Sequence, residues 1–188
     1  GAIDLAKRLS QEEGWFTPCQ FENQANVLAH YETTGPEILH ALPEVDVFIA
    51  GMGTGGTLMG VGKRLKEHNP KVKVIGVEPR MGEQLQGLRS LQEGYIPPLL
   101  DLSRLDGRFL VDSQAAFACA RAVLDVEGIF AGVSSGAVLH CAQRLARRMD
   151  RGNIVVIFAD GGWKYLASGP WREAARVQVE HPDDMAWW

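Results

Sequence analysis

The stretch VDVFIAGMGTGGTLMGVGKRL, from Val45 to Leu65, joins an apolar segment to a segment with helical spacing through a run rich in glycine. Residues 45–50 predict a buried strand, and the apolar residues from Leu58 onward predict a helix. The glycines of GMGTGGT, Gly51 to Thr57, let a backbone approach an anion, which the N–H groups at a helix start stabilise. The stretch therefore predicts a phosphate site at a strand-to-helix turn.

The rest of the chain alternates strands and helices in the same way. Further strands are predicted at residues 15–21, 71–77, 108–111 and 154–159. Helices are predicted at residues 2–13, at 26–42 with an interruption at Gly35-Pro36, at 113–127 and from Ser134 or Ser135 to Met149. This order favours an α/β fold with three layers: a mostly parallel sheet with helices on both faces. We predict one domain over residues 1–170, with a linking helix at 1–13, and a C-terminal tail at 171–188.

Composition excludes several classes of protein. The chain has 188 residues, 46% of them hydrophobic, and its 19 basic and 23 acidic residues give a net charge of −4. Without a dense basic run it is a poor binder of nucleic acid, and its apolar segments are too short to span a membrane. Cys19, Cys119 and Cys141 lie in no metal-ligand spacing, so we expect reduced thiols, no metal site and a cytoplasmic protein.

Two kinds of phosphate ligand fit the glycine run. Gly51, Gly53 and Gly56 satisfy the pattern GxGxxG, and Glu78 ends the next predicted strand, where an acid binds the ribose of a dinucleotide. An NAD-dependent oxidoreductase is therefore one alternative, and a non-enzymatic regulatory or interaction fragment is another. Thr54 and Thr57 favour instead one compact terminal phosphate, because they add two hydroxyl groups to the same loop.

Two further loops open toward the same predicted crevice. One is Val133-Ser134-Ser135-Gly136, in which we expect one serine to be the N-cap of the following helix. The other is Asp160-Gly161-Gly162, directly after the last predicted strand. Because ligands bind at the carboxyl ends of parallel strands, these loops and the glycine run together indicate a cofactor site.

Several motifs together resemble the cysteine synthases, which are pyridoxal-phosphate (PLP) β-replacement enzymes of fold type II. In chain order they are QFENQAN (20–26), His30, TTGPEI (33–38), GMGTGGT, VEP (77–79), EGIFAGVSSGA (127–137) and DGGWKYLASG (160–169). The last two are most similar to the B-type enzymes, which include relatives of O-phosphoserine sulfhydrylase. The resemblance implies the large C-terminal domain of that fold and PLP as the cofactor.

The resemblance also implies roles for single residues. Gly53, Thr54, Gly55, Gly56 and Thr57 would cradle the cofactor phosphate, and Ser134 would hydrogen-bond the pyridine nitrogen. A neutral serine there leaves that nitrogen largely unprotonated, which suits β-elimination through an aminoacrylate. Gln20 would lie near the substrate carboxylate, and Arg89 would recognise an anionic leaving group. The implied reaction makes L-cysteine from O-acetylserine or O-phosphoserine and a sulfide donor, in a homodimer.

Two motifs of the family are absent from the printed sequence. Neither the Lys-Asp-Arg segment that carries the Schiff-base lysine nor the Ser-Gly-Asn-Thr-Gly substrate loop occurs in it. We therefore assign no catalytic residue, and we expect the chain to correspond to the C-terminal part of a cysteine synthase. Its partner would be the missing N-terminal part, without which the chain would be inactive.

Overall fold

The computed structural model describes residues 2–166 and 185–187 of the chain. The helices are α1 (Ala2–Leu9), α2 (Ala25–Ala29), α3 (Gly35–Ala41), α4 (Gly56–His68), α5 (Ser113–Glu127) and α6 (Val133–Ala146). A π-helix, η1, spans His30–Thr34, and short 3-10 helices span Leu91–Glu93, Leu102–Arg104 and Gly162–Tyr165. The strands are β1 (Val47–Gly51), β2 (Lys73–Pro79), β3 (Gly107–Val111), β4 (Ile154–Val156) and β5 (Met185–Trp187).

The strands form one sheet in the order β4-β1-β2-β3-β5. The first four are parallel, with Ile49 opposite both Ile75 and Val156, and β5 runs antiparallel to β3 at the edge. The predicted tail thus contributes β5 to the sheet, while its residues 171–184 and 188 lie outside the described part. The mostly parallel α/β fold is confirmed.

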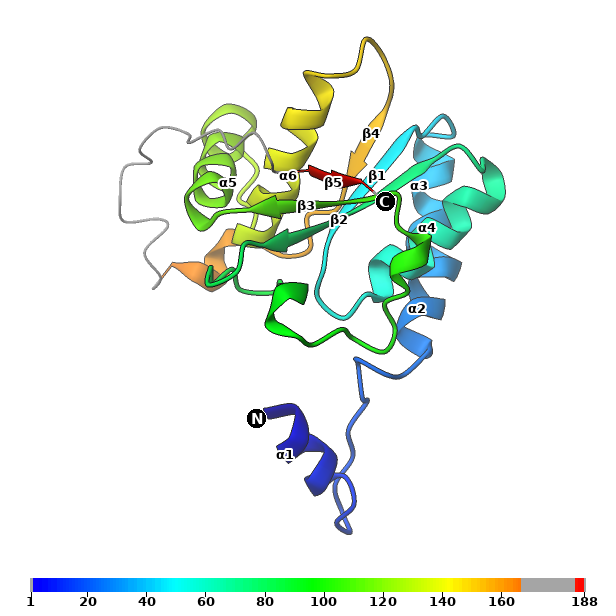
Figure 1. The fold of residues 1–188 in the computed structure, drawn as a ribbon, viewed down its shortest axis with the longest axis vertical. Coiled ribbons are helices and arrows are strands. Elements are labelled where there is room, and N and C mark those ends of the chain that lie inside the picture. Colours follow the sequence, from blue (N-terminus) through cyan, green and yellow to red (C-terminus); the bar gives the residue numbers. More distant parts are fainter. Residues whose placement is uncertain (1, 167–184, 188) are drawn as a thin grey trace.

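Helices cover both faces of this sheet, as Figure 1 shows: α2, α3 and α4 lie on one side and α5 and α6 on the other. Alternation along β1 assigns its side chains to the two faces. Phe48 packs in the core shared with α4, whereas Ile49 packs in the core shared with α5 and α6, and both are fully buried. The three-layer arrangement follows from this two-sided burial.

Two local predictions differ from the structure. Residues 15–21 form no strand, since Pro18 has no N–H to donate and Trp15 and Phe16 are exposed. The helix predicted over 26–42 is not broken at Gly35-Pro36 but widens into η1 directly before it. Pro36 lacks the N–H that an uninterrupted α-helix would use, so the irregularity lies in the preceding turn.

The N-terminal helix α1 lies apart from the sheet, below it in Figure 1. An ion pair between Lys7 and Glu22 connects this helix to the segment before α2.

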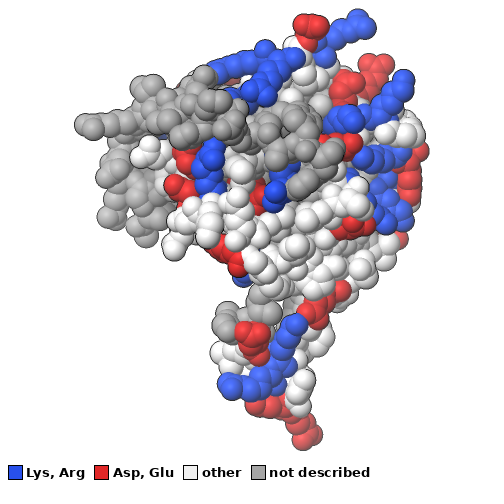
Figure 2. Space-filling view, in the orientation of Figure 1, with Lys and Arg blue, Asp and Glu red and all other residues white. Residues whose placement is uncertain are grey.

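Figure 2 shows acidic and basic side chains interspersed along the right-hand edge of the visible face, without a broad field of one sign there. Cys119 and Cys141 are buried free thiols, as expected, and burial raises the pKa of Cys119 to about 11.

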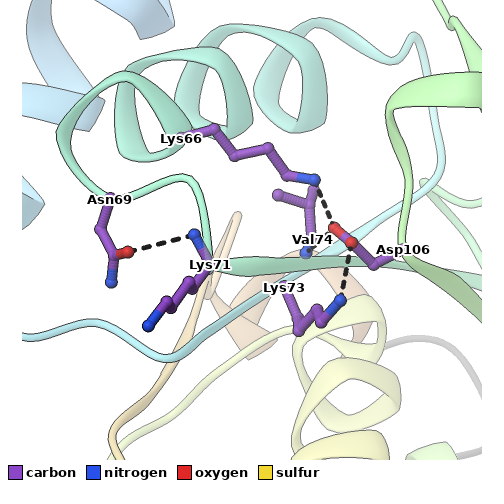
Figure 3. Close-up of polar contacts among 6 residues, drawn as sticks. All are labelled: Lys66, Asn69, Lys71, Lys73, Val74 and Asp106. Carbon is purple, nitrogen blue, oxygen red and sulfur yellow. Dashed lines mark hydrogen bonds and ion pairs between the residues drawn. The ribbon is translucent and has the colours of Figure 1, made fainter.

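A half-buried carboxylate connects α4 to the starts of β2 and β3 (Figure 3). Asp106 accepts hydrogen bonds from Lys66 Nζ at 2.6 Å, from Lys73 Nζ at 3.2 Å and from the backbone N–H of Val74 at 2.9 Å. Asn69 turns the chain between α4 and β2 by accepting the Lys71 N–H. These contacts hold the start of β2 against α4 and the start of β3.

Replacing Asp106 with asparagine is expected to lower the free energy of unfolding by about 1–2 kcal/mol at neutral pH. Burial alone would raise the pKa of Asp106, but hydrogen bonds from Lys66, Val74 and Lys73 outweigh it, and the pKa is lowered. Such a carboxyl stabilises the fold above its unfolded pKa of about 4, and this stabilisation is lost as the pH falls below that value. Urea unfolding at pH 7 and at about pH 3 measures both effects. Asp125→Asn, exposed on α5, is the control: it should leave the free energy of unfolding at pH 7 nearly unchanged and keep the loss of stability at low pH that wild type shows.

Candidate functional site

A cleft of about 810 Å³ opens at the carboxyl edge of β1, β2 and β4. Its walls come from the glycine loop, the irregular segment after β2, the start of α6 and the loop after β4. Of the predicted site residues, those that line it are Gln20, Gly53, Thr54, Gly55, Thr57, Arg89 and Ser134. Gly56 does not line it, because Gly56 is the first residue of α4 and its N–H is bonded to Thr54 Oγ1.

The backbone of the glycine loop is packed so closely that a side chain at Gly53 or Gly55 would collide with its neighbours. A Cβ at Gly53 would lie 2.9 Å from the carbonyl oxygen of Gly87. Gly55 has φ +91° and is the N-cap of α4, so a residue with a side chain would be strained there. The loop thus brings bare backbone and the positive end of a 13-residue helix to the cleft, which suits an anion.

The hydroxyl of Thr57 is oriented by a histidine from η1. His30 Nε2 lies 3.1 Å from Thr57 Oγ1, and His30 Nδ1 lies 3.0 Å from Thr34 Oγ1. Burial lowers the pKa of His30, so its ring is neutral at physiological pH and carries one hydrogen. If that hydrogen is on Nε2, Thr57 accepts it and keeps its own hydrogen for a ligand oxygen.

The hydroxyl of Thr54 is held in the same way by Asn26. Asn26 Nδ2 lies 3.0 Å from Thr54 Oγ1 and 2.8 Å from the carbonyl oxygen of Gln20. Asn26 and His30 are four residues apart and therefore share one helix face, which lies against the start of α4. Both residues belong to motifs named in the sequence, but no role was predicted for them. The signal that could have indicated their role is the i, i+4 spacing of Asn26 and His30, which matches two threonines three residues apart.

The start of α6 separates the two serines. Neither is the N-cap that we expected: the cap is Gly132, which has no side chain to bond the free N–H groups of this turn. Ser134 lines the cleft, while Ser135 is 1% exposed and points into the protein. Its Oγ has no hydrogen-bond partner within residues 2–166 and 185–187.

The loop after β4 brings a carboxylate to the same end of the cleft. Asp160 Oδ2 accepts the Tyr165 hydroxyl at 2.6 Å and lies 3.5 Å from Lys164 Nζ. Burial, together with this bond to Asp160, raises the pKa of Tyr165 to about 12. The Gly132 N–H donates to the Asp160 carbonyl oxygen at 2.9 Å, which anchors this loop against the start of α6.

Arg89 lies on the opposite wall, beside two aromatic rings that contact each other. Its guanidinium carbon is 5.2 Å from the ring centre of Phe21 and 5.4 Å from that of Tyr95. Its backbone N–H donates to Met52 O at 2.9 Å, which connects it to the glycine loop. Stacking on aromatic faces restricts a guanidinium while leaving its N–H groups available for an anion.

Glu78 does not reach the cleft. Its side chain is fully buried, and its carboxylate accepts the Leu91 N–H and the Arg108 guanidinium, the latter at 2.8 Å. An acid that binds ribose must face the ligand, whereas this one joins β2 to β3. The geometry therefore removes the residue on which the NAD-dependent alternative depended.

The described part of the chain contains neither a candidate membrane span nor a candidate metal-binding cluster. No described helix is long and apolar enough to cross a membrane. Among residues 2–166 and 185–187, no three His, Cys, Asp or Glu side chains are grouped so that they could hold a metal ion.

The fold and the cleft together define an α/β domain with a cleft at the carboxyl edge of a parallel sheet and, beside the cleft, a helix start whose backbone suits an anion. Comparison with known proteins identifies its family. The chain belongs to the pyridoxal-phosphate dependent enzymes, whose family model matches residues 1–160. This confirms the resemblance found in the motifs, and it confirms PLP as the family's cofactor.

The relatives are β-replacement enzymes of this family. The chain is 40% identical to a cysteine synthase of Staphylococcus aureus, over 89% of this chain and 57% of that protein. It is 39% identical to cysteine synthase B of Pseudomonas aeruginosa, over 90% of this chain and 57% of that protein. The chain thus spans little more than half the length of the relatives it matches.

Solved structures similar to this chain also belong to PLP-dependent enzymes of this kind. An O-ureido-L-serine synthase superposes with a TM-score of 0.83 at 34% identity, covering 96% of this chain and 59% of that one. A hydrogen sulfide-producing enzyme from Fusobacterium nucleatum gives a TM-score of 0.79 at 38% identity, covering 88% of this chain and 59% of that one. At these identities the likeness extends beyond the fold to the family.

Proposed function

We propose that this chain is the cofactor-binding C-terminal part of a cysteine synthase, which makes L-cysteine from an activated serine and a sulfide donor. The observation that carries the proposal is one cleft lined by the glycine loop, Ser134, Gln20 and Arg89. Family membership supplies the cofactor, and the similarity to cysteine synthases supports the reaction.

The residues of the cleft suit the parts of PLP. The backbone at Gly53 and Gly55 and the hydroxyls of Thr54 and Thr57, all of which line the cleft, would hold the phosphate, whereas Gly56 contributes by starting α4 and keeping Thr54 in place. Ser134 would donate its hydroxyl hydrogen to the pyridine nitrogen without transferring it. When bound, PLP supplies an electron sink for bonds at the α-carbon of an amino acid.

The opposite wall suits the substrate. Gln20 would hydrogen-bond the substrate carboxylate through its side-chain amide. Arg89 would bind the leaving group when that group is a phosphate, since its planar fork of N–H donors matches phosphate oxygens. We therefore infer O-phosphoserine as the preferred activated serine over O-acetylserine.

The complete enzyme needs groups that this sequence does not contain. We infer that the lysine that binds PLP covalently comes from an N-terminal part, that the chain alone has no synthase activity, and that the complete enzyme is a cytoplasmic homodimer. Mass spectrometry of the purified protein, together with an activity assay before and after adding that N-terminal part, tests this inference.

Replacing Thr57 with valine tests the phosphate site. We expect PLP to bind the wild-type chain, inorganic phosphate to compete with it, and Thr57→Val to weaken binding by about three- to tenfold through loss of one hydrogen bond. Equilibrium dialysis measures the affinity. Thr57 is a better probe than Gly55, because a Cβ at residue 55 would meet Leu100 Cβ at 2.9 Å and strain the loop.

Thr33→Val is the matched control. The Thr33 hydroxyl donates to the Ala29 carbonyl on an exposed helix turn, so its loss should not change PLP affinity. Equal PLP binding by wild type and Thr57→Val, or a failure of phosphate to compete, would contradict the assignment of the loop.

A further inference from the structure

Asn26 joins two walls of the cleft. Its Nδ2 donates to Thr54 Oγ1 at 3.0 Å and to the Gln20 carbonyl oxygen at 2.8 Å. A side-chain amide has two such hydrogens, so each acceptor receives one. Gln20 and Thr54 both line the cleft, and a single side chain therefore ties the segment before α2 to the glycine loop.

The same amide shapes the glycine loop. Thr54 Oγ1 accepts from Asn26 and also from the Gly56 N–H at 3.2 Å, which leaves the hydroxyl hydrogen available to a ligand oxygen. A Cβ at Gly56 would lie 2.0 Å from Asn26 Oδ1. Gly56 is thus a glycine because the Asn26 amide occupies the space of a side chain.

At its other end Asn26 fixes a segment that carries two substrate-side groups. Gln20 presents its side chain to the cleft, and the next residue, Phe21, contributes a ring beside the Arg89 guanidinium. The Phe21 carbonyl also accepts the Leu99 N–H at 3.3 Å. A shift of the backbone at residues 20–21 would therefore move both Gln20 and the support of Arg89.

We propose that Asn26 is a positioning residue that couples the glycine loop to the substrate wall. A phosphate bound on the loop fixes the position of the Thr54 hydroxyl. Through the two hydrogen bonds of Asn26, this also fixes the backbone position of Gln20 and Phe21. The proposal rests on the proposed function, because it takes the loop as a phosphate site. It adds that phosphate binding at the glycine loop changes the positions of Gln20 and Phe21 on the other side of the cleft.

Titration of the ¹⁵N-labelled chain with inorganic phosphate, and separately with PLP, tests the coupling by NMR. In wild type, the amide resonances of Gly55 and Gly56 should shift together with those of Gln20 and Phe21. In Asn26→Ala, the loop amides should still shift, with affinity about three- to tenfold weaker because Thr54 loses one partner. The Gln20 and Phe21 amides should no longer respond.

Two variants separate coupling from damage to the fold. Thr54→Val removes the acceptor at the other end of the link and should uncouple Gln20 and Phe21 in the same way, even if Asn26→Ala fails to fold. Asn23→Ala removes an asparagine of the same segment whose side chain bonds to nearby backbone, at Pro18 and Ala25, and it should leave every shift in place.

The outcomes distinguish this proposal from the one it rests on. If phosphate and PLP shift neither Gly55 nor Gly56 in wild type, the phosphate site is wrong and the coupling falls with it. If the loop amides shift but Gln20 and Phe21 do not, or if Gln20 and Phe21 still respond in Asn26→Ala and Thr54→Val, only the coupling is overturned.

Discussion

Replacing Arg89 with alanine in the complete enzyme is expected to raise the KM for O-phosphoserine by roughly ten- to a hundredfold, while the KM for O-acetylserine stays nearly unchanged. The reason is the loss of a charge-assisted bidentate contact, worth about 1.5–3 kcal/mol, to a phosphate that only the first substrate carries. Steady-state kinetics with both substrates measure the difference, and kcat at saturation should change less than KM.

The surroundings of Arg89 make this variant a clean test. Its side chain lies beside Phe21 and Tyr95, whose rings are in edge contact with centres 6.1 Å apart, so the rings still support one another without it. Arg89→Lys keeps the charge but loses the planar fork, and should recover only part of the affinity. Arg104→Ala, exposed and paired with Asp101, should affect neither substrate. Equal losses with both substrates would make Arg89 a structural residue.

Replacing Ser134 with alanine is expected to weaken PLP binding by roughly five- to a hundredfold. Ser134 lies in the cleft and is 7% exposed, so a pyridine nitrogen bound there would be left buried without a hydrogen-bond partner. Such an unsatisfied group costs about 1–3 kcal/mol. Equilibrium dialysis of PLP against the chain measures the loss, and β-elimination in the complete enzyme should slow with it.

The neighbouring variant, Ser135→Ala, serves as the matched control. Because Gly132 is the N-cap of α6, Ser135 makes no capping bond, and its hydroxyl is buried without a partner in the described part of the chain. Its removal should leave PLP binding unchanged and keep the free energy of unfolding equal or raise it by up to about 1 kcal/mol. A loss of PLP binding in Ser135→Ala alone would show that the two serines have the opposite roles.

Much of the site could be predicted from local patterns. Glycines between an apolar strand and an amphipathic helix indicate an anion cradle in any chain, because the requirement lies in the backbone itself. The later loops at Ser134 and Asp160 follow predicted strand or turn ends, and parallel strands bring such ends to one edge. The structure indeed places both beside the glycine loop.

Predictions failed where a side chain's role depends on what it meets across the fold. Glu78 has the position of a ribose-binding acid in the sequence, but its carboxylate forms an ion pair with Arg108 on the neighbouring strand. Residues 15–21 have the composition of a strand but no neighbouring strand to pair with. Ser134 and Ser135 match the pattern of a cap, but the N-cap of α6 is Gly132, two residues before Ser134 and three before Ser135.

The sequence by itself determined the alternation of strands and helices, the anion cradle and, through its motifs, the PLP-dependent family, since each depends on residue order and local backbone chemistry. Only the tertiary structure decided that Asn26 and His30 orient Thr54 and Thr57, and that the rings of Phe21 and Tyr95 lie beside Arg89. Apart from the contact of Arg89 with Tyr95, those contacts join residues about 30 to 70 positions apart, and their geometry exists only after helices pack against the sheet edge.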